Sequence, residues 1–249
     1  SYPTPTAIDV FYTNSEGYLI TPEVLPYGEY SLVEVQAPYG YALDKTPVAF
    51  SVSSENAEKE NSLTIVKVEK QNTAQKGKIS VQKTGDIFTS VATASSAYTN
   101  ENGEMIVNPT TYTPVFADGD LSGAVFQVIA VEDIVTLDGT TRAYAGDVVL
   151  EITTDENGYA ETEPLYLGKY EVREIKAPYG YVLNNEPKDV EVTYAGQEFE
   201  VRDTVNTAFE NEYQSVRISL SKVMENDKLF GIYGKDNYTS IRFGLFAAE

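Results

Sequence analysis

Three residues whose side chains could react with one another fall on the apolar faces of predicted strands. Period-two alternation puts Glu174 in phase with the tyrosine and valine of YEVREI, Lys83 with the isoleucine and valine of KISVQK, and Asn211 with the aromatic residues of TAFENEY. An amine, a carboxyl group and an amide would then point toward one interior. Burying an ionised amine or carboxylate is costly, so these groups should be paired or held in their neutral forms.

Each of the three residues also has a simpler explanation. A lysine at a strand end usually extends its amine to water, and an asparagine that closes a strand usually belongs to a turn. A glutamate beside Ala-Pro is most often a rim residue. All three recur at constant spacing elsewhere in the chain, which argues against three coincidences. We therefore treat Lys83, Glu174 and Asn211 as one candidate site.

Internal repetition is the most informative feature of the 249-residue chain. Two long stretches match at an offset of 140 residues, and a second pair matches at 139. The repeating unit is therefore about 140 residues long. The matching pairs are 25–44 with 165–184, 72–83 with 211–222 and, more weakly, 123–132 with 240–249.

The chain is cut out of phase with this unit. Residues 1–74 correspond to the back part of a unit that lacks its first strands, 75–214 to a complete unit, and 215–249 to the front part of a third. We call the first two the front repeat and the middle repeat. No Gly/Ser-rich linker separates them, so neighbouring repeats should stack stiffly.

The partial repeats carry partial copies of the candidate site. Glu34 and Asn72 occupy the positions of Glu174 and Asn211, and Lys222 occupies the position of Lys83. The first lysine of the chain is Lys45, so residues 1–74 contain no first-strand lysine. The front repeat is therefore predicted not to complete a site of its own.

Short alternating runs separated by turn signals predict an all-β protein with sandwich architecture. Amphipathic helical spacing is not convincing anywhere. Residues 86–120 are rich in threonine and serine and weakly patterned, and we interpret them as an insertion between the first two core strands. The sequences DENG (155–158), NENG (100–103) and Asp-Gly-Asp (118–120) are interpreted as turns, because no full set of calcium ligands follows them.

Composition excludes several classes of function. Cysteine and histidine are absent, which rules out disulfides, a thiolate nucleophile, a histidine base and a zinc site with the usual ligands. A net charge of −20 argues against nucleic acid or an anionic membrane as partner. The apolar runs are too short for membrane insertion, and no signal peptide or LPxTG sorting pattern is visible. We expect no cofactor and no metal.

The motifs ISVQKTGD, GAVFQVI, KYEVREIKAPYGYVL and AFENEYQ follow one another in an order that resembles Cna B-type (SpaA-like) domains of Gram-positive surface proteins and pilins. The similarity covers nearly the whole chain, and E-x-x-A-P-x-G-Y is its most specific motif. The resemblance implies tandem prealbumin-like or inverse immunoglobulin-like β-sandwiches. It also implies a spontaneous intramolecular isopeptide bond, with Lys83 as nucleophile, Asn211 as acceptor and Glu174 as the acid that shuttles protons.

Elementary physical chemistry agrees with these implied roles. Desolvation favours the neutral amine of a buried lysine and the neutral acid of a buried glutamate. The amine of Lys83 could then attack the amide carbon of Asn211, while protonated Glu174 polarises the carbonyl and helps ammonia to leave. Holding the groups together can contribute about 7–11 kcal/mol, so no separate enzyme is required.

The expected function is structural. We expect stalk-like repeats of a cell-wall-anchored adhesin or pilin-like protein outside a Gram-positive cell, with neighbouring repeats as partners. The alternative is an adhesin module in which residues 86–120 recognise a host or matrix ligand. A hydrolase is disfavoured, because no nucleophile–base arrangement is visible.

A further expectation concerns the two ends of the chain. The tail segments 216–222 and 240–248 correspond to strands that the front repeat lacks. One chain could therefore complete the next by head-to-tail strand addition. The simpler explanation is that the sequence is part of a longer protein.

Overall fold

The computed structural model describes residues 7–55, 58–60, 63–108, 110–222 and 243–244. Every regular element within these ranges is a β-strand, so the expected all-β fold is confirmed. No helix in the described ranges is long and apolar enough to cross a membrane. The chain divides into two compact units, Ser1–Tyr213 and Gln214–Glu249.

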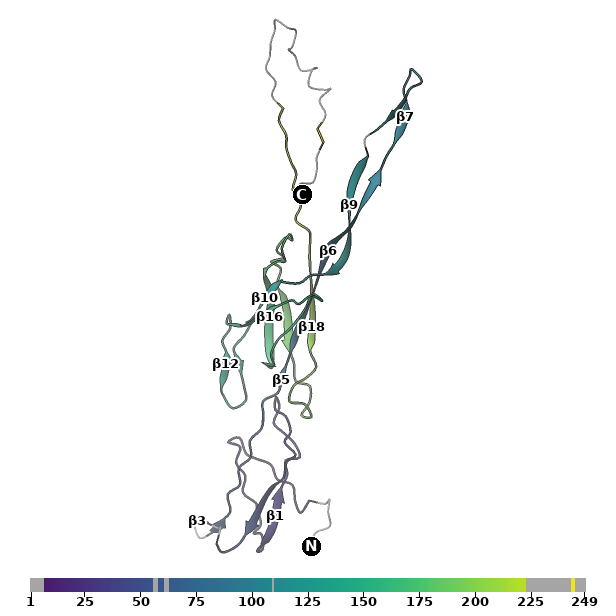
Figure 1. Cartoon of the computed structure of the whole chain (residues 1–249). Coiled ribbons are helices and arrows are strands. Elements are labelled where there is room, and N and C mark those ends of the chain that lie inside the picture. The colour runs from purple at the N-terminus through teal and green to yellow at the C-terminus, as the bar shows by residue number, and fades with distance from the viewer. Residues whose placement is uncertain (1–6, 56–57, 61–62, 109, 223–242, 245–249) are drawn as a thin grey trace. The chain divides into compact units, whose positions relative to one another are not determined.

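The middle repeat is a sandwich of two sheets (Figure 1). One sheet has the order β13–β10–β16–β17. The other has the order β14–β6–β18, and β9 also pairs with β6. The strands are β6 (Ile79–Ala94), β9 (Thr111–Asp120), β10 (Val125–Ala130), β13 (Val148–Thr153), β14 (Tyr159–Glu161), β16 (Gly168–Lys176), β17 (Lys188–Val192) and β18 (Val205–Asn211).

The core lies between these sheets, because alternate residues of each strand are buried. In β10 every second residue is buried, as expected for a strand with one face on a core. Phe126 of β10 meets Phe209 of the opposite sheet with ring centroids 4.8 Å apart. Tyr170 is also buried, and its hydroxyl donates to the carbonyl oxygen of Tyr166 at 2.7 Å. Smaller strand pairs border the sandwich: β5 (Lys76–Gly77) with β15 (Leu165–Tyr166), and β11 (Ile134–Val135) with β12 (Thr141–Ala143).

The front repeat contains two antiparallel strand pairs. Its β1 (Gly28–Leu32) pairs with β2 (Val48–Val52), and β3 (Glu58–Glu60) pairs with β4 (Leu63–Ile65). The rings of Tyr30 and Phe50 stack across the first pair at 5.6 Å. This is less strand structure than the middle repeat has, although the two sequences match.

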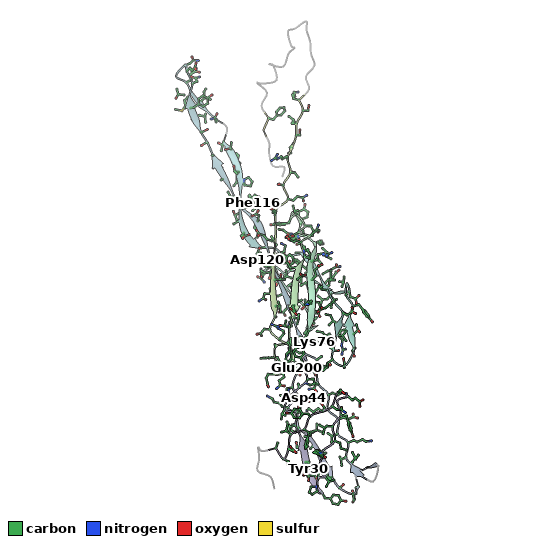
Figure 2. The ribbon with its side chains drawn as sticks, turned by 180° about the vertical axis from the view of Figure 1, so that it is seen from behind. Tyr30, Asp44, Lys76, Phe116, Asp120 and Glu200 are labelled. Carbon is green, nitrogen blue, oxygen red and sulfur yellow. The ribbon has the colours of Figure 1, made fainter. Side chains whose placement is uncertain are left out.

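The insertion is a two-stranded ribbon, which we define as residues 86–120. Strand β6 continues beyond the sandwich and pairs with β9 as far as Ala94, and β7 (Ala97–Thr99) pairs with β8 (Met105–Val107) near the tip (Figure 1). Phe116 and Asp120 both lie on β9, and Asp120 marks where the ribbon meets the sandwich (Figure 2).

The prediction of a turn at 118–120 is wrong. These residues belong to β9 and pair with residues 84–86 of β6. A Cβ on Gly119 would meet the Cδ1 atom of Ile87, the end of a partly exposed side chain, so a larger residue there would require that side chain to move. The NENG segment does form a turn, in which Gly103 N donates to Asn100 O at 3.0 Å between β7 and β8.

The strand expected at 216–222 is not formed. These residues are exposed and lie in no strand, which is consistent with the marginal stability of a strand that has no partners. The other expected tail strand, 240–248, lies outside the described residues except for Phe243 and Gly244.

Candidate cross-linking site

The candidate site brings together the first and last strands of the middle repeat. Strands β6 and β18 are parallel neighbours, with Lys83 opposite Phe209 and Gly85 opposite Asn211. Paired residues point to the same face of a sheet, and so do residues two apart on one strand. Lys83 and Asn211 therefore share the face that looks into the core.

All three predicted residues are buried. The exposed fractions are 0% for Lys83, 1% for Glu174 and 3% for Asn211. Glu174 reaches the site from β16 in the opposite sheet, where Tyr170 and Val172 share its core-facing side. The simpler explanations, in which the lysine extends to water and the glutamate sits at a rim, do not fit this burial.

Glu174 is held by two hydrogen bonds. The Nδ2 atom of Asn211 donates to its Oε1 at 3.0 Å, and the backbone N of Asn184 donates to its Oε2 at 2.8 Å. Asn184 lies in the segment between β16 and β17. That segment therefore fixes the carboxyl group against the amide of the last strand.

Burial changes the chemistry of the Lys83 amine. Desolvation lowers its pKa from the usual 10.5 to about 8, although the negative charges of Glu174 and Glu210 oppose the change. The Nζ atom lies 3.3 Å from the carbonyl oxygen of Thr84, to which it donates. A pKa of about 8 leaves roughly a tenth of this amine neutral, and hence nucleophilic, at pH 7.

The amide oxygen of Asn211 is the unpaired atom of the site. Among the described side chains that are not exposed, Asn211 Oδ1 is the one buried polar atom without a hydrogen-bond partner. An amide can be reversed with little change in shape. The reversed amide would place Oδ1 at Glu174, where the acid form of the carboxyl group can donate to it. That arrangement would give the oxygen a partner and would leave Nδ2 in the unpaired position instead.

Two glycines that the sequence analysis did not single out shape this site. A Cβ on Gly85 would collide with the backbone oxygen of Asn211 and lie 2.7 Å from Leu121 Cδ1. Gly158 has a φ of +66°, and a Cβ there would collide with the backbone oxygen of Lys83. For Gly85 the available signal was a glycine inside a strand pattern, which marks a close approach of another backbone, whereas Gly158 belongs to the DENG segment that was predicted as a turn.

The backbone of Lys83 is fixed on the same side by two neighbours. Its N–H donates to Gly158 O at 2.7 Å, and its carbonyl oxygen accepts from Leu121 N at 3.0 Å. The DENG turn that ends at Gly158 thus helps to fix the backbone of Lys83. Its Asp155 oxygen caps the turn by accepting from Asn157 N and Tyr159 N.

The front repeat reproduces the acid–amide pair. Asn72 Nδ2 donates to Glu34 Oε2 at 2.7 Å, and Asp44 N donates to the same oxygen at 3.0 Å. These three residues are half-buried rather than fully buried. Lys222, which occupies the lysine position of the third unit, is exposed and lies outside any strand.

One prediction about the last strand is wrong. Tyr213 was expected on the core face with Asn211, but β18 ends at Asn211 and Tyr213 is 43% exposed. Its ring instead contacts Phe116 at 5.3 Å and Tyr181 at 5.2 Å. The tyrosine therefore ties the base of the ribbon to the end of the sandwich. No cluster of side chains suited to hold a metal occurs in the described ranges.

The two facing sheets define a β-sandwich domain of the prealbumin-like class. The chain belongs to the SpaA family, described as a prealbumin-like fold domain, whose model matches residues 4–69 and 116–207. These matches include Glu34 and Glu174 and leave out Lys83 and Asn211.

Individual relatives were found among surface proteins and pilins. The trypsin-resistant surface T6 protein of Streptococcus pyogenes serotype M6 is 31% identical over 80 residues, which are 32% of this chain and 14% of that protein. The Bacillus anthracis TIE protein is 25% identical, with a TM-score of 0.43 over 76% of this chain and 26% of that one. The Streptococcus agalactiae minor pilin GBS52 is 17% identical, with a TM-score of 0.34 over 84% of this chain and 70% of that one. The chain thus spans a minor part of the first two.

Proposed function

We propose that this chain is a stalk segment of a cell-wall-anchored adhesin or pilin-like protein, exposed outside a Gram-positive cell. We further propose that its middle repeat joins Lys83 to Asn211 through an isopeptide bond that forms without an enzyme. The observation that carries this proposal is the complete burial of Lys83 beside Asn211 and Glu174. A buried lysine without such chemistry would weaken the fold.

The proposed reaction converts an amine and a primary amide into a secondary amide and ammonia. The lone pair of neutral Lys83 Nζ attacks Cγ of Asn211, and the carbonyl electrons move to Oδ1, where the acid form of Glu174 donates a hydrogen bond. Glu174 then carries a proton from Nζ to Nδ2. The C–Nδ2 bond breaks, ammonia leaves, and Glu174 is returned in the form in which it began.

The bond would serve a stalk because of where it lies. It would close a loop of 128 residues, from Lys83 to Asn211. By analogy with disulfide loops, this constraint on the unfolded chain is worth about 5 kcal/mol, less any strain. It would also join the strands at the two ends of the middle repeat, so tension could pass between repeats without loading the hydrogen bonds of the sheets.

Mass spectrometry of the denatured chain tests the proposal directly. Wild type should lack one ammonia relative to its sequence, and a Lys83–Asn211 peptide pair should appear after digestion. Lys83→Arg and Glu174→Gln should each show their full sequence masses. Glu191→Gln is the matched control, because Glu191 is exposed on β17, and it should lack one ammonia like wild type. A wild-type chain of full mass would overturn the proposal.

A second candidate function, ligand binding by the ribbon, is favoured by its surface. The ribbon has exposed apolar side chains, including Phe88 at 52%, Tyr112 at 70% and Met105 at 75% exposure. Large exposed apolar residues that gather on one element are typical of interaction sites. The end of the ribbon next to the sandwich is held in place by the ring contacts of Tyr213 with Phe116 and Tyr181. The Tyr181 hydroxyl also donates to Asp86 O at 2.6 Å.

A further inference from the structure

Most contacts between the front and middle repeats involve one loop of the middle repeat, residues 194–200, which we call the joint loop. Gln75 is completely buried against it. Its Nε2 donates to Gly196 O at 2.8 Å and to Phe199 O at 2.7 Å, and its Oε1 accepts from Ala195 N at 2.7 Å. Both side-chain donors and the acceptor are thus used, so its burial carries no unpaired polar atom.

The joint loop also holds the front repeat through Gln197. Its Oε1 accepts from Ala37 N at 2.9 Å, and its backbone oxygen accepts from Leu43 N at 2.7 Å. Gln75, the first residue of the middle repeat, thus anchors the joint loop within that repeat, whereas Gln197 binds the loop to the front repeat. The backbone bond from Lys76 N to Glu200 O, at 2.9 Å, holds the same loop within the middle repeat, and Figure 2 labels both residues.

An aromatic pair completes the joint. The ring of Tyr39, in the APYGY motif of the front repeat, meets the ring of Tyr194 at 4.6 Å. Such pairs contribute about 0.5–1.5 kcal/mol beyond the area they bury. Gly40, in the same motif, has a φ of +84°, and its carbonyl oxygen accepts from Gln75 N at 2.8 Å. The motif is thus a docking element as well as a turn.

The middle repeat carries the same docking residues at the corresponding positions. Its APYGY motif spans 177–181, at the offset of 140, and Gln214 corresponds to Gln75 at the offset of 139. Tyr179, the counterpart of Tyr39, is fully exposed. Val182 and Leu183 beside it are 51% and 38% exposed. We call residues 177–183 the second docking face.

We propose that the second docking face binds the joint loop of another repeat of this kind, one that carries the tyrosine and glutamine of Tyr194 and Gln197. The occupant follows from the joint already formed, in which the equivalent residues bind such a loop. Tyr179 would pair with the incoming tyrosine, and the backbone N–H groups of Ala177 and Leu183 would donate to the incoming glutamine. This inference extends the proposed stalk function by naming the partner of one end of the middle repeat.

Two sequence or structural differences limit which contacts of the first joint can also form at the second docking face. Lys45 pairs with Glu198 at 2.8 Å in the first joint, but its counterpart in the middle repeat is Asn185. Exposed ion pairs contribute little, so this loss is tolerable. The hydroxyl of Tyr41 accepts from Asp138 N at 3.3 Å, whereas that of Tyr181 is engaged by the ribbon. The shared contacts are therefore the glutamines, the motif backbone and the exposed tyrosine.

The test uses the full chain with a second copy of residues 76–214 inserted directly after Gln214. Because the chain has no cysteine, Glu156→Cys in both copies allows two spin labels to be placed on exposed turns. Pulsed electron resonance then gives the distribution of distances between labels. A narrow distribution is expected, and Tyr179→Ala combined with Gln214→Ala should make it about twofold broader, as when a docked joint becomes a flexible linker.

Three comparisons make the result decisive. Tyr98→Ala, an exposed tyrosine on the ribbon, should leave the width unchanged. Tyr39→Ala with Gln197→Ala, read with labels at positions 29 and 156, should broaden the first joint. Lys83→Arg should leave the second joint narrow, so failure of the cross-link and failure of the docking face are distinguishable. A broad distance distribution in the duplicated chain without substitutions would overturn the inference. So would a distribution whose width does not change when Tyr179→Ala and Gln214→Ala are introduced together.

Discussion

Asn211 donates a hydrogen bond to Glu174 at 3.0 Å, and the same pair recurs in the front repeat, where Asn72 donates to Glu34 at 2.7 Å. In both repeats a backbone N–H ten residues after the glutamate also binds its carboxyl group. The acid–amide pair is therefore built by the back part of a repeat alone. The lysine is the component that must come from a first strand.

The first prediction is that the front repeat forms no cross-link from its own lysines. Its earliest lysine is Lys45, which binds Glu198 at the joint instead. Tandem mass spectrometry of digested wild type should contain no Lys45–Asn72 or Lys59–Asn72 peptide pair. The total loss should be one ammonia rather than two. Recovery of either pair would show that the assignment of repeat boundaries is wrong.

The second prediction concerns the rate of bond formation. The amine must be neutral to attack, and its pKa of about 8 sets the neutral fraction. With Glu174 in the acid form that the reaction requires, the rate should rise about tenfold per pH unit below pH 8 and level off above it. Chain that has not yet folded, taken up in guanidinium from inclusion bodies, can be refolded at each pH, quenched in acidic denaturant and measured by mass spectrometry. A rate that does not change between about pH 5 and pH 8 would contradict the assigned nucleophile.

The third prediction concerns stability in a chain that cannot form the bond. In Asn211→Ala, the lysine pKa is lower in the folded than in the unfolded state, so the unfolded chain binds more protons between about pH 8 and pH 10.5. The free energy of unfolding should therefore rise with pH across that window, and the penalty should be fully present below it. Urea titrations should show this rise in Asn211→Ala and its loss when Lys83→Met is added.

The measurement should stop near pH 9.5, because burial raises the pKa of Tyr170 from 10 to about 12. Above pH 10 the unfolded chain loses that proton first, and stability then falls as pH increases. An Asn211→Ala chain whose stability does not rise between about pH 8 and pH 9.5 would show that Lys83 is not desolvated.

The fourth prediction tests the close approach at Gly85. A methyl group there would collide with the backbone of Asn211, so Gly85→Ala should displace the end of β18 and slow bond formation. It should also cost about 1–3 kcal/mol of unfolding free energy, which is typical of overpacking. Gly28→Ala is the matched control, because its Cβ would meet only the ring of Tyr30 at 3.7 Å. Equal effects of the two substitutions on bond formation would rule out this role for Gly85.

Period-two alternation could identify the buried face of each strand, because it is a local property of the backbone. It therefore placed Lys83 and Glu174 correctly, both on core-facing sides. It failed at Tyr213, because the strand ended two residues earlier, and strand ends depend on partners far away in sequence. The turn predicted at 118–120 from Asp-Gly-Asp failed for a related reason, because pairing with β6 overrides that local turn preference.

Other features of the site and of the ribbon could not be predicted from the types of side chain in the sequence. Glu174 is held by the backbone N of Asn184, and any residue except proline could supply that donor. The ribbon was recognised as an insertion, but its weak pattern gave no strands. Its side chains are exposed on both faces, so neither face imposes the alternation that a core does.

The last prediction concerns what the ribbon binds. No lysine or arginine occurs between Lys83 and Arg142, whereas the ribbon carries five acidic residues. Beyond Gly85, where β18 ends, β6 pairs with β9 alone, which leaves one edge of β6 open in the described ribbon. An extended polypeptide with alternating basic and apolar residues would suit this edge, because added strands bind through backbone hydrogen bonds and side-chain charge selects among them.

A labelled peptide of alternating lysine and valine should therefore bind the full chain in fluorescence anisotropy, more weakly as salt increases. A glutamate–valine peptide of the same length should not bind. Replacing residues 88–116 with Asn-Gly, which keeps the paired base of the ribbon, should abolish binding without changing the ammonia loss of the middle repeat. Glu191→Gln, outside the ribbon, should bind as wild type does. Equal binding by the chain without its ribbon would show that the peptide responds to net charge alone.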